Sequence, residues 1–484
     1  MSSLTILNDT EVKSLLHNLH REEVEALQKT LRDALYEYST NANKDKEECS
    51  FQQPERQQLD RNNGTTTLFM PSTSSAGIGM KVVTLGAPRN APLNDDPDAP
   101  ELKKPTPRGS LTLFNNEGQP TGFVNAEELT AFRTALASSL LIVRRHKPKE
   151  VVVFGAGKQA FWHVRLTLMF HGATIERINI INHRFSETSR DFYKGLLGTD
   201  ELTKRREGWQ SVKFGMITPS YNEYDRMTRD QIRNADIIFC TTPSTEVLFD
   251  HTILTNPSGR VKGRLIIGVG SFKPHMIEIP PEILLQAVKL HGAGHHFRKR
   301  AIEGGVVLVD TINALGETGE LTRARADGNL HANNVIEIGE IVMVEESYHQ
   351  NNDDSSAIDD SSDPTPFDEP SPTGAKSPSS SLALAFREQS FESTNSSKSP
   401  SRKSSFSNIS RRGSRVFKSR RGSGVSDAPL KKKVSKEEEE LSQWLHKGNV
   451  IYKSVGLGLM DLVVGTEVVR MAKEKGIGAT FKDF

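Results

Sequence analysis

The sequence predicts an α/β protein whose central part forms a doubly wound parallel sheet, with further strands and helices at both chain ends. Three observations carry this prediction. A glycine turn at 155–160 lies between an apolar strand-like run and an apolar helix-like run. Further short apolar runs alternate with helical or polar stretches after it, as in sheets built from strand–helix–strand units. A sharp change of composition near Ser347 marks a long insertion before the last apolar segment.

Length and composition bound the class of protein. The chain has 484 residues, which favours two or three domains. Its formal net charge of +1 offers no overall attraction to nucleic acid or to a membrane surface, so neither is predicted as a partner. The hydrophobic fraction is 35% and the mean hydropathy is −0.48, so part of the chain is expected to be unfolded.

Cysteine usage and the first residues favour a cytoplasmic protein. The two cysteines, Cys49 and Cys240, make no disulfide framework and no metal-ligand cluster. The adjacent His295 and His296 lack a carboxylate or cysteine partner at a metal spacing, so no metal site is predicted. The first residues lack a basic flank followed by an apolar core, and no apolar run approaches the ~18 residues of a membrane span.

The residues before the glycine turn predict a small α+β unit. A strand at 4–7 is followed by a helix that continues to about Tyr38, with a cap at one of the polar residues 8–10. Short β-type runs follow between 65 and 113, interrupted by a Pro- and Asp-rich excursion at 91–108. The next apolar residues recur at helical spacing from Asn125, a second candidate cap.

The glycine turn itself predicts a dinucleotide-binding domain of the Rossmann type. Gly155, Gly157 and Ala160 form the pattern GxGxxA directly after a strand. Glycine there permits a tight turn and lets a pyrophosphate approach the start of a helix. The strand-like segments ADIIFCTTPS, GRLIIGVGS and GGVVLVDT extend the sheet. The alternative is a glycine turn with a structural role only.

The end of the next strand favours NADPH over NADH. Asn182, His183 and Arg184 lie there, with Asn182 placed 22 residues after Ala160, where NAD enzymes offer an acidic residue to the ribose. A guanidinium suits a 2′-phosphate instead. The alternative is a solvated polar strand end.

The segment 347–440 is predicted to be disordered, because it is rich in Ser, Pro, Asp and Asn. Its second half is basic and contains RRGS twice, so we expect a basophilic kinase to phosphorylate Ser414 and Ser423. The alternative is a neutral insertion in a surface loop. After Leu441 the pattern predicts an extended segment followed by a helix.

Several segments together resemble a known family. GMKVVT, PRN, LTAFRTALAS, VVVFGAGKQA, ADIIFCTTPS, GVGSFKPHMIEI and IYKSVGLGLMDL occur in the order seen in ornithine cyclodeaminases and mu-crystallins. The resemblance runs from Leu4 to the C-terminus, except for the excursion and the insertion. Among fungal members, the chain is similar to the proline-utilisation proteins called PrnX-like.

The resemblance implies a domain organisation. A substrate-binding and dimerisation domain is expected from 1–131, with its return at 325–346 and 441–484. The nucleotide-binding domain is expected at 132–324, and the family implies a homodimer.

The resemblance also implies the site. Lys81 and Arg133 match family positions that bind the carboxylate of an amino or imino acid, and both are expected to be catalytic. Arg56, or alternatively Arg61, is expected to help bind it. A guanidinium can hold a carboxylate bidentately, while an ammonium supplies a charge and a proton. Without the resemblance, Lys81 would be a solvated strand residue and Arg133 a surface ion-pair partner. The expected cofactor contacts are Gly155, Ala156, Gly157, Lys158, Gln159, Asn182, His183, Arg184, Thr241, Thr242, Val269, Gly270 and Ser454.

One departure from the family bears on the reaction. Cyclodeaminases carry an aspartate at the position that aligns with Phe272, and neither the adjacent Ser271 nor His275 is an obvious replacement. The sequence therefore predicts an NAD(P)-dependent imine reductase acting on a small amino or imino acid. The alternatives are a cyclodeaminase-type lyase with bound NAD and a non-catalytic NAD(P)-binding regulatory protein.

Overall fold

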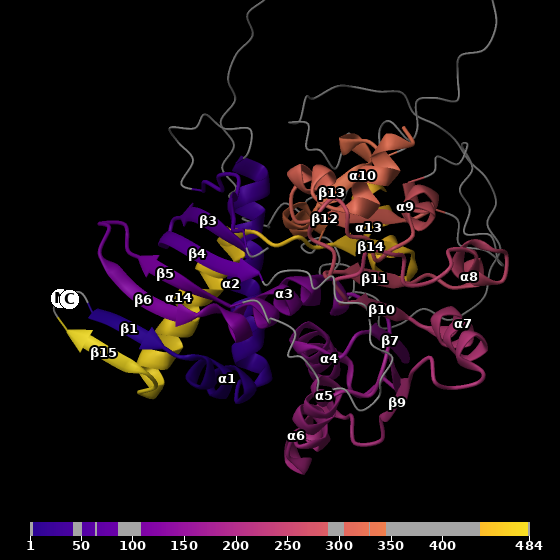
Figure 1. The fold of residues 1–484 in the computed structure, drawn as a ribbon, viewed down its shortest axis with the longest axis horizontal. Helices are drawn as coiled ribbons and strands as arrows, with labels where there is room; N and C mark the ends of the chain where they lie inside the picture. Colours follow the sequence, from indigo (N-terminus) through magenta and orange to yellow (C-terminus); the bar gives the residue numbers. More distant parts are fainter. Residues whose placement is uncertain are drawn as a thin grey trace, which may run out of the picture.

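A computed structural model of the chain describes residues 3–41, 51–62, 65–85, 108–288, 304–328, 330–344 and 436–482. Two sheets lie side by side, each with its own helices (Figure 1). The phosphorylation candidates Ser414 and Ser423, and most of the expected insertion, lie outside the described residues.

The first sheet joins the two chain ends. Its seven strands lie in the order β15-β1-β6-β5-β4-β3-β2, and only the β1–β6 pair is parallel. The strands are β1 (Ser3–Leu7), β2 (Gln57–Asp60), β3 (Thr66–Ser74), β4 (Gly77–Leu85), β5 (Arg108–Phe114), β6 (Pro120–Asn125) and β15 (Ala479–Lys482). The strand expected at 4–7 is thus β1.

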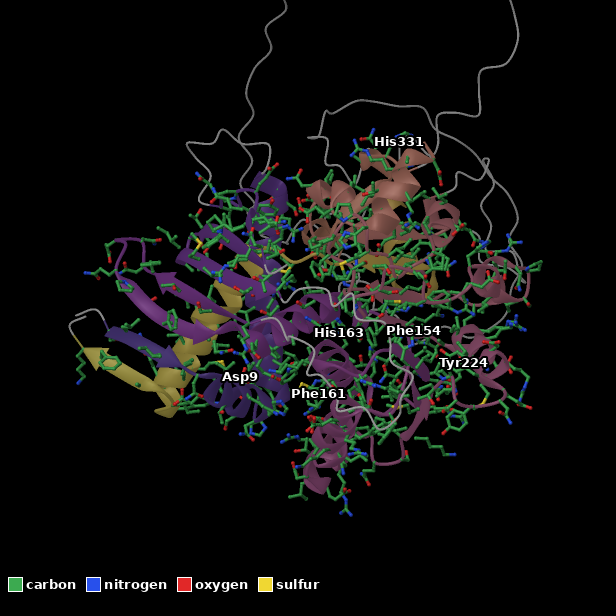
Figure 2. The ribbon with its side chains drawn as sticks, viewed as in Figure 1. Asp9, Phe154, Phe161, His163, Tyr224 and His331 are labelled. Carbon is green, nitrogen blue, oxygen red and sulfur yellow. The ribbon has the colours of Figure 1, made fainter. Side chains whose placement is uncertain are left out.

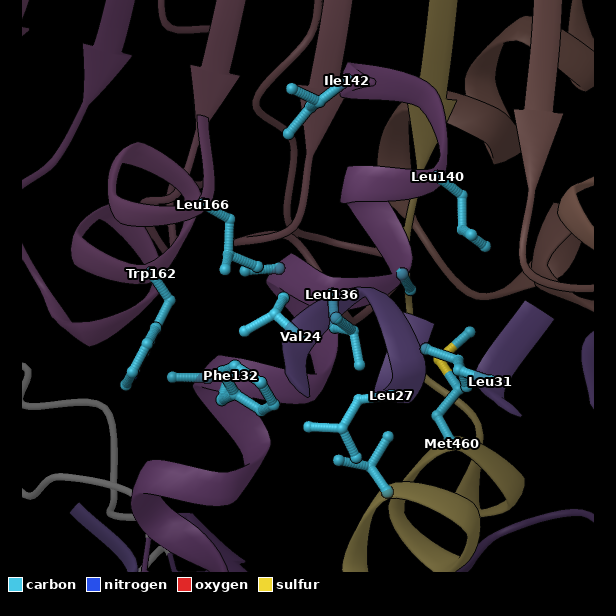
Figure 3. Close-up of a cluster of buried hydrophobic side chains, with 14 of the residues drawn as sticks. Val24, Leu27, Leu31, Phe132, Leu136, Leu140, Ile142, Trp162, Leu166 and Met460 are labelled. Atoms are coloured by element: carbon cyan, nitrogen blue, oxygen red, sulfur yellow. The ribbon is translucent and has the colours of Figure 1, made fainter. Parts of the chain in front are cut away.

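Four helices build the core on one face of this sheet. They are α1 (Asp9–His17), α2 (Arg21–Asn41), α3 (Ala126–Ile142) and α14 (Gly458–Lys475). Two glycines let α14 approach the strands, because a Cβ at Gly122 would lie 2.8 Å from Val469 and one at Gly465 would lie 2.4 Å from Leu111. Figure 3 shows apolar side chains of α2 and α3 packed together, with Met460 of α14 beside them.

The first helical segment is two helices and not the single one that the sequence pattern predicts. Asn8 caps α1 in a reciprocal capping box with Glu11. The helix ends at Asn18, and α2 begins after His20, whose backbone N–H donates to Glu23. No glycine or proline marks this break, so local pattern alone does not reveal it.

The second sheet is the doubly wound one. Its eight strands are all parallel and lie in the order β13-β12-β14-β11-β10-β7-β8-β9. The strands are β7 (Glu150–Phe154), β8 (Arg177–Ile181), β9 (Lys213–Ile217), β10 (Ile237–Cys240), β11 (Leu265–Gly268), β12 (Val306–Val309), β13 (Val335–Glu337) and β14 (Val450–Lys453).

Helices cover both faces of the second sheet (Figure 1). The α-helices are α4 (Lys158–His171), α5 (Glu187–Leu197), α6 (Glu201–Glu207), α7 (Tyr224–Asn234), α8 (Thr252–Thr255), α9 (Pro281–Val288), α10 (Gly319–Ala326) and α13 (Lys436–Lys447). Short 3-10 helices are η1 (Gly259–Val261), η2 (Ile312–Gly316), η3 (Ala332–Asn334) and η4 (Ile338–Val344). Within the described ranges, no helix is long and apolar enough to cross a membrane.

The structure differs from the expected domain boundaries at two places. Strands β13 and β14 belong to the parallel sheet, so 335–337 and 450–453 do not return to the first domain. All four residues of β14 are buried, and it pairs with β11 and β12 at once. A short apolar run suits such a strand, because helices cover both faces of a parallel sheet. The part of the C-terminal segment that returns is α14 and β15.

The segment that precedes β14 was expected to be extended from Leu441 onward, but its residues up to Lys447 belong to helix α13. Helix α13 ends beside Arg145, whose guanidinium donates to the carbonyl oxygens of Leu445 and Gly448 at 3.0 Å each. These contacts satisfy carbonyls that a helix end leaves without partners.

Candidate functional site

Three side chains from three elements meet between the two sheets. The Nζ of Lys81, on β4, donates to Oδ1 of Asp461 at 2.9 Å, and the Nε of Arg133, on α3, donates to the same oxygen at 3.1 Å. Lys81 is 2% exposed, Arg133 4% and Asp461 0%. These three residues are called the Asp461 cluster below. Ionised, it carries one positive charge more than negative charge.

The fold explains how residues so distant in sequence meet. Lys81 pairs with Leu111 of β5, whose side chain lies on the helix-covered face, so Lys81 points to that face as well. Asp461 lies in the first turn of α14, where an acid is favourable to the helix dipole. The start of this helix is held by Gln53, whose Oε1 accepts the Leu459 N–H at 2.8 Å.

Burial tunes the acidity of Lys81. Desolvation lowers the pKa of its ammonium to about 8, opposed by the Asp461 carboxylate and reinforced by the Arg133 guanidinium. The second oxygen of Asp461, Oδ2, is buried and has no hydrogen-bond partner among the described residues. The cluster therefore combines a lysine that can give up its proton near neutral pH with unfilled hydrogen-bonding capacity.

A glycine turn lies against the Arg133 guanidinium. Gly456 has a φ of +90°, and a Cβ built on it would lie 2.7 Å and 2.8 Å from the two terminal nitrogens of Arg133. Asp310, directly after β12, holds this turn by accepting the N–H groups of Val455 at 2.7 Å and Gly456 at 2.6 Å. Its carboxylate also accepts hydrogen bonds from Tyr452 and Ser454.

Arg56 lies near Asp310, which holds the Gly456 turn against Arg133. Its guanidinium forms an ion pair with Glu317, which follows η2, and the charge of Asp310 acts on it. Burial lowers the pKa of Arg56 from its ordinary value. Asp310 thus links Arg56 to the Gly456 turn that lies against Arg133, and Asp461 links Arg133 to Lys81. The alternative candidate, Arg61, lies directly after β2, and its side chain is exposed rather than held near Asp310.

The GxGxxA turn has room for a phosphate group. Gly155 has a φ of +98°, and its Cβ would lie 2.9 Å from Thr242. Gly157 is the N-cap of α4 and has no side chain to cap the helix, and a Cβ there would meet nothing within 4 Å. Open space at an uncapped helix N-terminus suits an anionic group. Gln159 Oε1 and Thr242 Oγ1 are buried without partners among the described residues.

The other expected cofactor residues lie along the carboxyl ends of the parallel strands. Thr241 follows β10, Val269 and Gly270 follow β11, and Ser454 follows β14. In open parallel sheets this edge is where ligands bind. Ala156 lies inside the glycine turn.

The Lys158 side chain forms ion pairs with acids of the first part of the chain. Its Nζ lies 2.9 Å from Glu128 and 3.5 Å from Asp9, which belong to α3 and α1. Figure 2 labels Asp9, which lies on α1. This ammonium therefore joins the two parts of the chain. The backbone N–H of Lys158, in the first turn of α4, is the group of this residue that remains available to a phosphate.

The end of β8 carries the residues from which the sequence predicts NADPH, with its 2′-phosphate, over NADH. His183 and Arg184 are exposed there. Asn182 shapes the turn, because its side-chain amide donates to the Arg184 carbonyl at 2.9 Å and to Ser189 at 3.0 Å. Ser186 then caps α5.

Sequence reasoning missed a second buried polar group, formed by Glu278, Glu320, Lys453 and Ser271. Glu278 accepts the N–H groups of Thr242 at 2.8 Å, Gly270 at 2.6 Å and Ser271 at 2.9 Å, and so joins the loops after β10 and β11. Burial raises the pKa of Glu278 to about 7. An acidic residue inside the apolar run MIEI was the available signal.

The position of the family's aspartate holds no acid. Phe272 is half-buried in the loop after β11. The adjacent Ser271 is buried, donates to Glu320 at 2.5 Å and accepts from Lys453 at 2.7 Å. His275 is exposed in the same loop. Across the described ranges, no group of three or more His, Cys, Asp and Glu side chains is arranged to hold a metal ion.

Comparisons with known proteins agree with this architecture. No family model matches the chain. The chain is 26% identical over 299 residues to a Δ1-pyrroline-2-carboxylate reductase of Bacillus cereus, a match that covers 60% of this chain and 75% of that protein. Its homologues therefore include imine reductases.

Solved structures share the fold. An archaeal alanine dehydrogenase dimer with bound NAD is 16% identical, with a TM-score of 0.56 over 100% of both chains. The Δ1-pyrroline-2-carboxylate reductase of Thermococcus litoralis, in complex with NADH and L-proline, is 15% identical, with a TM-score of 0.56 over 98% of this chain and 99% of that one. A probable ornithine cyclodeaminase of Bordetella pertussis is 18% identical, with a TM-score of 0.54 over 98% and 99%. The predicted fold class is thereby confirmed.

Proposed function

We propose that the protein is an NAD(P)-dependent imine reductase that acts on a small imino acid, with Δ1-pyrroline-2-carboxylate as the first substrate to test. The single observation that carries the proposal is the buried Asp461 cluster, formed by Lys81, Arg133 and Asp461. Its excess positive charge suits one substrate carboxylate. The similarity to Δ1-pyrroline-2-carboxylate reductases supports the choice of substrate class.

Each cation has a role in this proposal. Arg133 and Arg56 bind the carboxylate, and Gly456 leaves room for the terminal nitrogens of Arg133. Lys81 holds a proton at Nζ that the imine nitrogen takes as the C=N bond becomes CH–NH. Asp461 orients both cations through one oxygen. When bound, the nicotinamide supplies the hydride that the imine carbon receives.

The uncapped start of α4 and the strand ends beside it fit a dinucleotide. We propose that Gly157 and the first N–H groups of α4 hold the pyrophosphate, and that Thr241, Thr242, Val269, Gly270 and Ser454 line the crevice toward the nicotinamide. The exposed His183 and Arg184 support the proposed preference for NADPH over NADH.

A cyclodeaminase-type lyase with bound NAD is the second candidate, favoured by the fold shared with a probable ornithine cyclodeaminase. Phe272 weighs against it, because no carboxylate replaces the family's aspartate there. A non-catalytic NAD(P)-binding protein is the third. Net cofactor oxidation, ammonia release without net oxidation, and cofactor binding alone distinguish the three.

The open face of the first sheet supports a homodimer. Ile6, Ile78 and Phe123 are 37%, 40% and 43% exposed, although all three are apolar. The strand registers place them on the face opposite α14, with Ile6 directly beside Phe123. Exposed apolar patches of this kind mark association surfaces. The match to a dehydrogenase that is a dimer agrees with this proposal.

The cellular setting is also part of the proposal. We propose a cytoplasmic enzyme of proline utilisation, of the PrnX-like kind, whose insertion a basophilic kinase phosphorylates at Ser414 and Ser423. Mass spectrometry of the protein from growing cells tests the two serines. The function itself is tested by cofactor oxidation with a panel of cyclic imino acids, followed by assays for ammonia in the same reactions.

A further inference from the structure

The ion pair between Arg56 and Glu317 differs from the ion pairs of the Asp461 cluster. Its side chains are 22% and 35% exposed, whereas those of Lys81 and Asp461 are 2% and 0% exposed. Arg56 comes from the segment before β2, and Glu317 comes from the loop after η2 in the other part of the chain. The pair therefore joins the two parts of the chain close to solvent.

Two buried carboxylates near these cations are fixed in place. Asp310 accepts backbone N–H groups of Val455 and Gly456, and Asp461 accepts from Lys81 and Arg133. Removing either would leave several buried donors without partners, which is costly. Neither carboxylate can readily make way for a ligand.

Glu317 is held by fewer interactions than Asp310 and Asp461. Its carboxylate contacts only Arg56 within the described part of the chain, and its backbone N–H donates to Ala314 at 3.0 Å. A partly exposed carboxylate with one cationic partner costs little to displace, because water can solvate it once the pair opens. Among the acids described near Arg56, Lys81 and Arg133, Glu317 is thus the one that a ligand carboxylate can displace.

We propose that the Glu317 carboxylate occupies the position of the substrate carboxylate on Arg56 in the ligand-free protein, and that the imino acid displaces it on binding. This inference rests on the proposed function and deepens it. Glu317 is then a specificity-determining residue. It lowers the affinity for every carboxylate ligand, and once displaced it leaves a negative charge at the rim of the site. That charge disfavours a second carboxylate on the substrate.

The experiment compares wild type, Glu317→Gln, Arg56→Met and the double variant, each saturated with NADPH. The probe is pyrrole-2-carboxylate, a planar carboxylate without a reducible imine bond, and calorimetry measures its affinity. Glu282→Gln, an exposed acid on α9, is the matched control. Arg56→Gln, which also removes the charge but keeps a polar side chain, replaces Arg56→Met in the same comparison if the methionine variant does not fold.

We expect Glu317→Gln to tighten binding of the probe by about five- to tenfold, and Arg56→Met to weaken it by about tenfold or more. In the Arg56→Met background, Glu317→Gln should change nothing, because the competition has been removed. We also expect the penalty for a dicarboxylic analogue to shrink in Glu317→Gln.

Unchanged or weaker binding by Glu317→Gln would overturn the inference, as would an equal effect in both backgrounds. Failure of wild type to bind the probe would overturn it too. Binding that follows the expected pattern without any turnover would reject the proposed reductase while keeping the role of Glu317. The two failures are therefore distinguishable.

Discussion

Lys81 and Arg133 donate to the same oxygen of Asp461, over 2.9 Å and 3.1 Å. One carboxylate thereby fixes a cation from a strand near the N-terminus and a cation from the helix that leads into the parallel sheet. The arrangement leaves one excess positive charge in a buried place. A buried charge of this kind requires a partner, and a substrate carboxylate would supply it.

Replacing Lys81 tests the proton donor. In Lys81→Met the site keeps Arg133 but has no ammonium, so we expect kcat/KM for imine reduction to fall by about 100-fold or more. Cofactor affinity should remain, because Lys81 lies on the first sheet. Lys149→Met, at an exposed lysine, is the control and should keep full activity. Equal rates for the Lys81 variant and wild type would remove Lys81 from the reaction.

Asp461 should control the pH dependence. The pKa of Lys81 lies at about 8, so its protonated fraction, and with it kcat/KM, should fall as the pH rises through that value. The Asp461 carboxylate raises the pKa of Lys81, so Asp461→Asn should lower it further and move the alkaline limb to lower pH. Profiles from pH 6 to 10 with the same substrate, and with Glu474→Gln as control, measure the difference. A limb that stays in place or moves to higher pH contradicts the assignment.

Gly456 tests the position of Arg133. Alanine at Gly456 puts a Cβ within 3 Å of the guanidinium, whereas alanine at Gly476, which also has a positive φ, meets nothing within 4 Å. Both variants should lose about 1–2 kcal/mol of stability from backbone strain. Only Gly456→Ala should raise KM, by roughly tenfold or more. Chemical denaturation and steady-state kinetics separate the two effects, and equal kinetics would show that the contact with Arg133 has no part in binding.

The end of β8 should set the cofactor preference. In a His183→Ala/Arg184→Ala variant we expect the Kd for NADPH to rise by about tenfold, while the Kd for NADH stays within about twofold of wild type. Fluorescence titration of both cofactors measures the ratio. A parallel loss for the two cofactors would mean that these side chains stabilise the turn rather than recognise a 2′-phosphate.

The exposed face of the first sheet should form the dimer interface. Phe123→Asp places a charge in the middle of this face, so we expect the protein to become monomeric. Leu202→Asp is the matched control, because Leu202 is 77% exposed on α6 of the other unit. Light scattering coupled to gel filtration gives the mass of each variant. A dimeric Phe123→Asp protein would exclude this face.

The sequence predicted the parts of the fold that local pattern determines. The GxGxxA turn, the apolar strand before it and the helix after it are all found, as is the cap Asn125. Of the three candidate caps at 8–10, the structure selects Asn8. The position of β14 was not predictable in this way. Its residues 450–453 pair with β11 and β12 across more than a hundred residues of chain, and periodicity carries no information about strand partners.

The residues of the site also divide into those that the sequence predicted and those that it did not. Lys81 and Arg133 were found because they stand in recognisable segments, and the structure brings them together. Asp461, Asp310 and Glu278 were missed, since each is a single acid within or directly after an apolar run. Such an acid gives no sign of its partner until the fold places donors around it. Glu317 was missed because only tertiary structure brings it to Arg56.

The most direct test of the central claim is the oxidation of NADPH by the purified full-length protein with Δ1-pyrroline-2-carboxylate, with proline and ammonia quantified in the same reactions. The account predicts one proline formed for each NADPH oxidised, no ammonia, and loss of turnover in Lys81→Met. Ammonia release from an amino acid without net oxidation of the cofactor, or tight NADPH binding with no turnover of any imino acid tested, would contradict it.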